Sequence, residues 1–159
     1  MNPQELVIKM ALDAWETQIR RAGELIDGFS DEQMLHEIAP GKNRAIYLAG
    51  HLVAIHDAMN DILGIGERSH AELDEVFVKN PDKTGIAMPS VSTIRKYWKE
   101  VHASLHIALY QITTESWFGR HCAMSDEDFS SNPLRNKLSV LINRTNHAAF
   151  HLGQLRLLK

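Results

Sequence analysis

Apolar side chains recur every three or four residues along most of the chain, with charged or amide side chains between them. Such spacing places the apolar positions on one face of an amphipathic helix. It predicts long helices over about residues 3–27, 44–63, 91–112 and 133–159. No stretch shows a convincing strand pattern. We therefore expect an all-α fold, a four-helix bundle with long crossover connections.

Short polar residues mark where these helices should begin. The predicted N-caps are Asn2, Asn43, Ser90 or Ser92, and Asn132. Pro3 and Pro133 directly follow two of these caps, and proline is favoured at the first helical position. Ser30 and Gln33 form a capping-box pattern, which predicts one short helical turn before the second long helix.

Two connections, residues 64–89 and 113–131, have no sustained period, although residues 71–79 favour a short helix. The first joins the second and third long helices and is long enough for a crossover. Connections of this kind often border a functional site. We find no repeat and no domain boundary, so we expect a single domain over residues 1–159.

Composition narrows the class of protein. Apolar residues make up 44%, charged residues make up 23%, and the net charge is -3. These values are ordinary for a globular protein, and no helix carries the basic face of a nucleic-acid or membrane surface. A single cysteine, Cys122, excludes an intramolecular disulfide. With no signal-peptide pattern and no long apolar span, we expect a cytoplasmic location.

The chain has nine histidines, and some of them are spaced as metal ligands. His147 and His151 lie four residues apart, so one helix face presents both imidazoles to a single divalent ion. His51, within the apolar stripe of the second long helix, is the candidate third ligand. His102 and His106 share the four-residue spacing, but they lie off their stripe and are expected on a solvated flank. The alternative for each histidine is an ordinary surface or hydrogen-bonded core residue.

Other candidates for chemistry are weaker. Cys122 follows His121, as a nucleophile might follow its base, but no third group orients the pair. Trp117 is expected to close one end of the bundle. Gln154, three residues after His151, is a candidate hydrogen-bond partner for a ligand imidazole, and an exposed helix end is the alternative. No phosphate-binding loop or Ser-His-Asp pattern is present.

The chain resembles the DinB superfamily of bacterial four-helix-bundle metalloproteins. The resemblance rests on Ala49-Gly50-His51-Leu52, on His147-Ala148-Ala149-Phe150-His151-Leu152-Gly153-Gln154, and on the Ser30–Gln33 and Pro40-Gly41 segments. It implies that His51, His147 and His151 hold one divalent transition metal, typically nickel or zinc. It also implies an open coordination position on that ion.

The same resemblance implies a metal-dependent thiol transferase that joins a low-molecular-weight thiol to a small electrophile. One alternative is a non-catalytic stress-related or interaction domain with a structural metal. A second is a metal-dependent hydrolase that uses bound hydroxide. Members of the family often form homodimers through a helix face, and outlying apolar residues such as Val7, Ile107 and Tyr110 would allow a dimer here.

Overall fold

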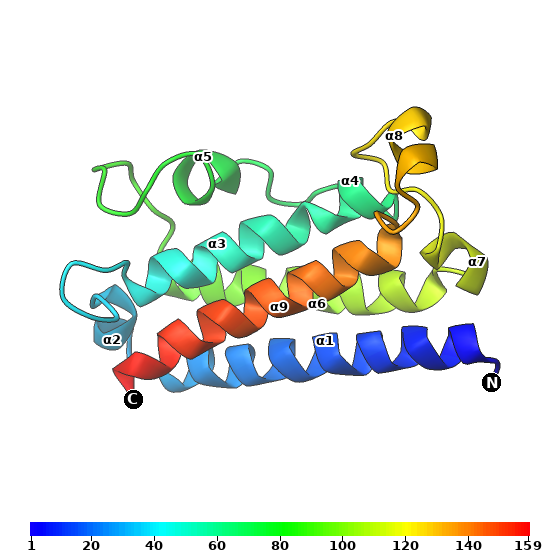
Figure 1. Cartoon of the computed structure of the whole chain (residues 1–159). Helices are drawn as coiled ribbons and strands as arrows, with labels where there is room; N and C mark the ends of the chain where they lie inside the picture. Colours follow the sequence, from blue (N-terminus) through cyan, green and yellow to red (C-terminus); the bar gives the residue numbers. More distant parts are fainter.

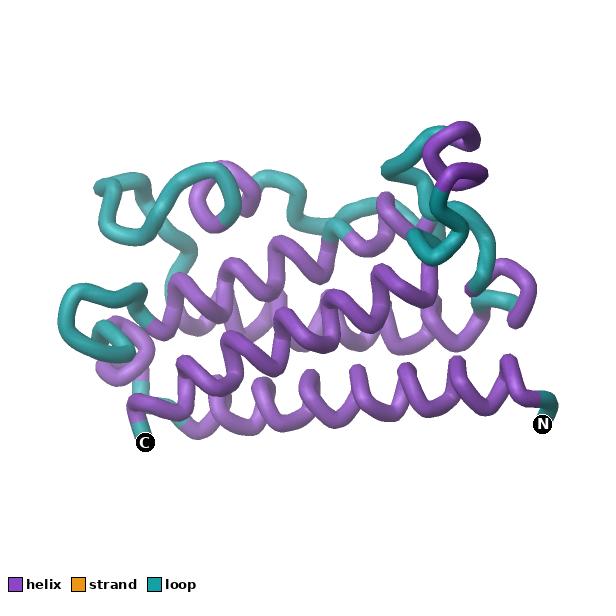
Figure 2. The backbone as a smooth tube through the Cα atoms, viewed as in Figure 1, coloured by secondary structure: helices purple, strands orange, loops and turns teal.

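The computed structural model describes residues 1–159 and consists of helices and loops without a strand (Figure 2). The elements are α1 (Pro3–Gly28), α2 (Asp31–Leu35), α3 (Ala45–Asp57), α4 (Met59–Leu63), α5 (Leu73–Phe77), α6 (Val91–Gln111), α7 (Thr114–Trp117), α8 (Asp126–Ser131), α9 (Lys137–Leu155) and the 3-10 turn η1 (Arg156–Leu158). The predicted all-α class is confirmed. None of the helices combines the length and hydropathy that crossing a membrane requires.

The long helices lie side by side in a bundle (Figure 1). Helices α1 and α9 run in one direction, and α3 and α6 run in the other. Because α3 and α6 are parallel neighbours, the chain must return along the bundle between them. The connection between α4 and α6 makes that return and carries α5 across the outside of the bundle, as the predicted crossover requires.

The bundle core is built from the apolar stripes of the long helices. Fully buried examples are Trp15, Ile26, Leu48, Leu52, Ile94, Leu105 and Leu141. Trp117 on α7 is 1% exposed and belongs to the same core, so the predicted closure of the bundle end is confirmed. Burial of large side chains at about 25 cal/mol per Å² of apolar surface is the main term that favours the folded state.

Two predicted helix starts are wrong. Asn43 does not cap α3; its carbonyl accepts from Ile38, and Arg44 occupies the cap position with no side-chain cap bond. Helix α9 begins at Lys137 and is capped by Asn136, not at Asn132 and Pro133. Lys137 donates its backbone N–H to the carbonyl of Gly119, which holds the start of α9 against the preceding loop.

Candidate metal centre

The structure brings together the three histidines that the sequence nominated. His51 projects from α3, and His147 and His151 project from α9, which packs against α3. The Nε2 atom of His147 lies 3.3 Å from Nε2 of His51 and 3.0 Å from Nε2 of His151. One ligand atom from each residue lies within 4.8 Å of the others. All three side chains are partly buried.

His51 is oriented by a backbone carbonyl from the crossover connection. Its Nδ1 lies 2.7 Å from the carbonyl oxygen of Phe77. A carbonyl only accepts, so Nδ1 carries the proton and donates it, which leaves a lone pair on Nε2. Gly50 permits this contact, because a Cβ at that position would lie 2.4 Å from the Phe77 ring. The glycine in the Ala49-Gly50-His51 motif therefore serves close packing between α3 and α5.

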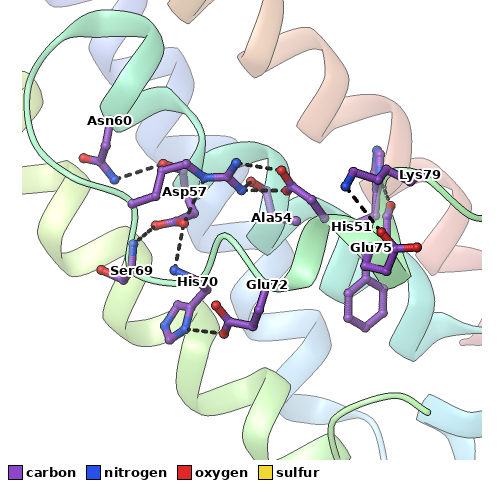
Figure 3. Close-up of polar contacts among 12 residues, drawn as sticks. His51, Ala54, Asp57, Asn60, Ser69, His70, Glu72, Glu75 and Lys79 are labelled. Carbon is purple, nitrogen blue, oxygen red and sulfur yellow. Dashed lines mark hydrogen bonds and ion pairs between the residues drawn. The ribbon is translucent and has the colours of Figure 1, made fainter. Parts of the chain in front are cut away.

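Asp57 anchors the loop that leads to α5. Its carboxylate accepts from the backbone N–H groups of Ser69 at 2.9 Å and His70 at 3.0 Å, as Figure 3 shows. Arg68 bridges this carboxylate and Asp74 on α5. Asp57 is only 1% exposed, because the crossover packs over its side of α3. The crossover is therefore tied to α3, and it holds α5 and the Phe77 carbonyl in a fixed position over that helix.

The ring of His151 has its own partner on α9. Its Nδ1 lies 2.7 Å from Oε1 of Gln154, and an amide oxygen accepts, so Nδ1 donates and Nε2 again keeps a lone pair. This hydrogen bond is the contact that sequence reasoning nominated for Gln154. His147 differs, because its Nδ1 is buried and has no hydrogen-bond partner.

Two of the three separations between these Nε2 atoms match those of ligands on one transition metal. Nitrogen ligands at about 2.0–2.1 Å from a tetrahedral ion lie about 3.3 Å apart, and those of an octahedral ion about 2.9 Å apart. The observed separations of 3.3 Å and 3.0 Å fall at these values. Imidazoles are also a donor type that zinc and nickel accept. The cluster therefore could hold one metal ion, while the ligand role of each histidine stays a prediction.

The electrostatic environment keeps these imidazoles neutral. Burial is the main cause that lowers the pKa of His51 and His151, and it lowers the pKa of His147 to about 4. The charge of Arg144, on the turn before His147, lowers the pKa of His51 and His147 further. Neutral imidazole is the form that binds metal, so the cluster presents ligands at neutral pH without first losing protons.

A second histidine pair, His56 and His102, lies in the core. His56 Nδ1 is 2.8 Å from His102 Nε2, and His102 Nδ1 is 2.7 Å from the carbonyl of Trp98. The expectation of a solvated flank for His102 is wrong, since only 9% of it is exposed. The apolar face of α6 is wider than the predicted stripe, and within it the His102 ring packs against Trp98 at a tilt of 45°. His106, one turn later, is exposed as expected.

The remaining candidates gain no support. His121 Nδ1 accepts from the backbone N–H of Ala123 at 3.2 Å, and no hydrogen bond joins it to the side chain of Cys122. Cys122 is exposed. A Cβ at Gly153 would meet nothing within 4 Å, so this glycine does not serve a close approach between helices. The three-histidine cluster remains the one grouping of ligand side chains suited to a metal ion.

Fold and cluster together define an all-helical protein with a three-histidine site that could hold a metal ion. The sequence model of the DinB superfamily matches residues 14–155, which is most of the chain. The chain therefore belongs to the DinB superfamily, and the resemblance noted in its motifs is confirmed. A comparison with curated proteins found no match.

Proposed function

We propose that this protein is a metal-dependent thiol transferase whose single divalent ion, nickel or zinc, is held by His51, His147 and His151. The convergence of three imidazole Nε2 atoms from two helices is the observation that carries the proposal. Membership of the DinB superfamily supports it as well. A set of three neutral ligands is typical of catalytic rather than structural zinc, because one coordination position stays open.

When bound, such an ion lowers the pKa of a coordinated thiol or water and so supplies a nucleophile near neutral pH. The protein's own residues prepare the site for this chemistry. The Phe77 carbonyl and the Gln154 side chain fix the protonated nitrogen of His51 and His151, so each ring keeps its Nε2 lone pair for the ion. Fixed rings lose little freedom on binding, which favours affinity.

Cobalt substitution tests the thiol role directly. A thiol transferase should bind a small thiol to the metal, and the cobalt form should then show a thiolate charge-transfer band. The His51→Ala variant should show none. A hydrolase should instead turn over ester or amide panels without thiol. Absence of both, in protein that carries cobalt, would favour an interaction domain with a structural metal and would contradict the transferase proposal.

A further inference from the structure

A hollow of about 480 Å³ lies where the end of α4 meets the first turns of α9. Ile62 lines it from α4, and Ser139, Asn143 and Arg144 line it from α9. The loop around His121 forms another wall, because the backbone N–H of Cys122 donates to the Ile62 carbonyl at 2.8 Å. No residue that lines the hollow is acidic.

Two guanidinium groups, those of Arg135 and Arg144, line this hollow without a carboxylate partner. Elsewhere in the chain Arg44, Arg68 and Arg95 each pair with a carboxylate. Neither Arg135 nor Arg144 has a carboxylate within 4.0 Å. The Nε atom of Arg144 is buried and lacks any hydrogen-bond partner. Arg144 itself is half-buried, and a buried donor without a partner is costly unless a ligand completes it.

The hollow and the three-histidine cluster share helix α9. Arg144 lies three residues before His147 and Asn143 lies four before it, so both are one helical turn from that imidazole. An ion held by three neutral imidazoles keeps its full double positive charge. Together with Arg144 it would form a concentrated positive region that contains no carboxylate. An anionic ligand would reduce the repulsion between the ion and Arg144, and it would give the guanidinium a hydrogen-bonding partner.

We propose that this hollow binds the anionic end of the small thiol that reacts at the cluster. Arg144 pairs with a carboxylate or phosphate group of that thiol, and Arg135 adds positive charge at the far side. Guanidinium suits both groups, since its planar fork donates two parallel hydrogen bonds to either. This assignment deepens the proposed function and rests on it, because it names the substrate class as an acidic thiol.

The first test uses the cobalt-substituted protein and the thiolate charge-transfer band. Mercaptocarboxylates of increasing chain length are compared with mercaptoalcohols of the same length. We expect the acid to bind about tenfold or more tightly than the alcohol at the chain length that spans both groups. Arg144→Gln should abolish this preference, and Arg144→Lys should retain part of it. Arg21→Gln, an exposed change on α1, should keep the wild-type preference.

Equal binding of acids and alcohols by the wild type, or an unchanged preference in Arg144→Gln, would overturn the assignment. A second titration separates its failure from that of the proposed function. Metal-free protein is titrated with succinate and with inorganic phosphate by calorimetry. If the wild type binds a probe and Arg144→Gln does not, the anion site is supported, even where no thiol binds to cobalt. In that case only the transferase proposal fails. Comparison of the two dissociation constants, for succinate and for phosphate, shows whether the site prefers carboxylate or phosphate. Absence of binding by both probes contradicts the anion site.

Discussion

At the scale of single residues, the least replaceable position near the cluster is Gly50. Its Cα faces the ring of Phe77, which is fully buried, so an added methyl group has no free space. We expect Gly50→Ala to destabilise the fold by about 1–3 kcal/mol through overpacking. It should also weaken metal binding, because a displaced Phe77 no longer aligns its carbonyl with His51.

Chemical denaturation and metal titration of the Gly50→Ala variant check both effects. Gly153→Ala is the matched control, since it adds the same methyl group to a helix beside the cluster where nothing lies within 4 Å. The control should be neutral or stabilising by up to about 1 kcal/mol, because alanine is the better helix former. Equal effects of the two substitutions would refute the packing role of Gly50.

The His56–His102 pair makes stability depend on pH. Burial lowers the pKa of His102 to about 4 and that of His56 well below its ordinary value. The unfolded chain, with histidine pKa values of about 6.5, therefore binds more protons than the folded chain in the range between. The free energy of unfolding should fall as pH drops from about 6.5 towards 4, by at most about 1.4 kcal/mol per pH unit for each histidine.

Urea denaturation of metal-free protein at about pH 7 and about pH 5 measures this dependence. Metal must be absent, because loss of a bound ion at low pH would add a second effect. His102→Phe removes one titrating group, so the difference in unfolding free energy between the two pH values should shrink. An undiminished difference in that variant would show that other groups cause the acid sensitivity.

At the scale of elements, the crossover acts as a support for the cluster. Asp57 holds the start of this segment through two backbone N–H groups and Arg68. We expect Asp57→Ala to cost about 2–4 kcal/mol, because it removes a buried carboxylate that accepts from two backbone N–H groups and pairs with Arg68. The amides of Ser69 and His70 should then exchange hydrogen faster. Asp61→Ala, an exposed change on the next helical turn, should leave these amides protected, and equal exchange in both variants would contradict the anchoring role.

The long helices were predictable because their apolar stripes are local patterns, and Ile8, Trp15 and Ile94 are buried as that spacing requires. The errors arise where distant segments meet. From the helical pattern alone, Asp57 is expected at the surface, but the crossover packs over it. Helix α9 begins later than predicted because the backbone N–H of Lys137 is bonded to the carbonyl of Gly119. Local patterns carry no information about either contact.

The cluster was predictable for a different reason. A pair of histidines four residues apart converges within one helix, so His147 and His151 needed no knowledge of tertiary structure. His51 needed the additional inference that a polar residue in an apolar stripe has a partner. The carbonyl of Phe77 that orients it lies 26 residues away in the crossover and leaves no signal in the helical pattern.

At the scale of the whole molecule, the homodimer stays a prediction. Val7, Ile107 and Tyr110, which the sequence nominated, are 48%, 61% and 46% exposed, so their side chains are free for an interface. Light scattering at micromolar concentration should give twice the chain mass for the wild type and one chain mass for Ile107→Glu. Leu157→Glu, also at an exposed position, is the control and should remain dimeric. A monomeric wild type at every concentration would refute the dimer.

The central claim is that one transition metal binds His51, His147 and His151, and elemental analysis of purified, dialysed protein tests it most directly. The variants are His51→Ala, His147→Ala and the control His106→Ala, which changes an exposed histidine that lies 2.7 Å from Glu16. We expect about one equivalent of metal in the wild type and the control, and a marked loss in the other two with helical content unchanged. No metal in any protein after reloading with zinc or nickel, or full occupancy in His51→Ala, would contradict the account.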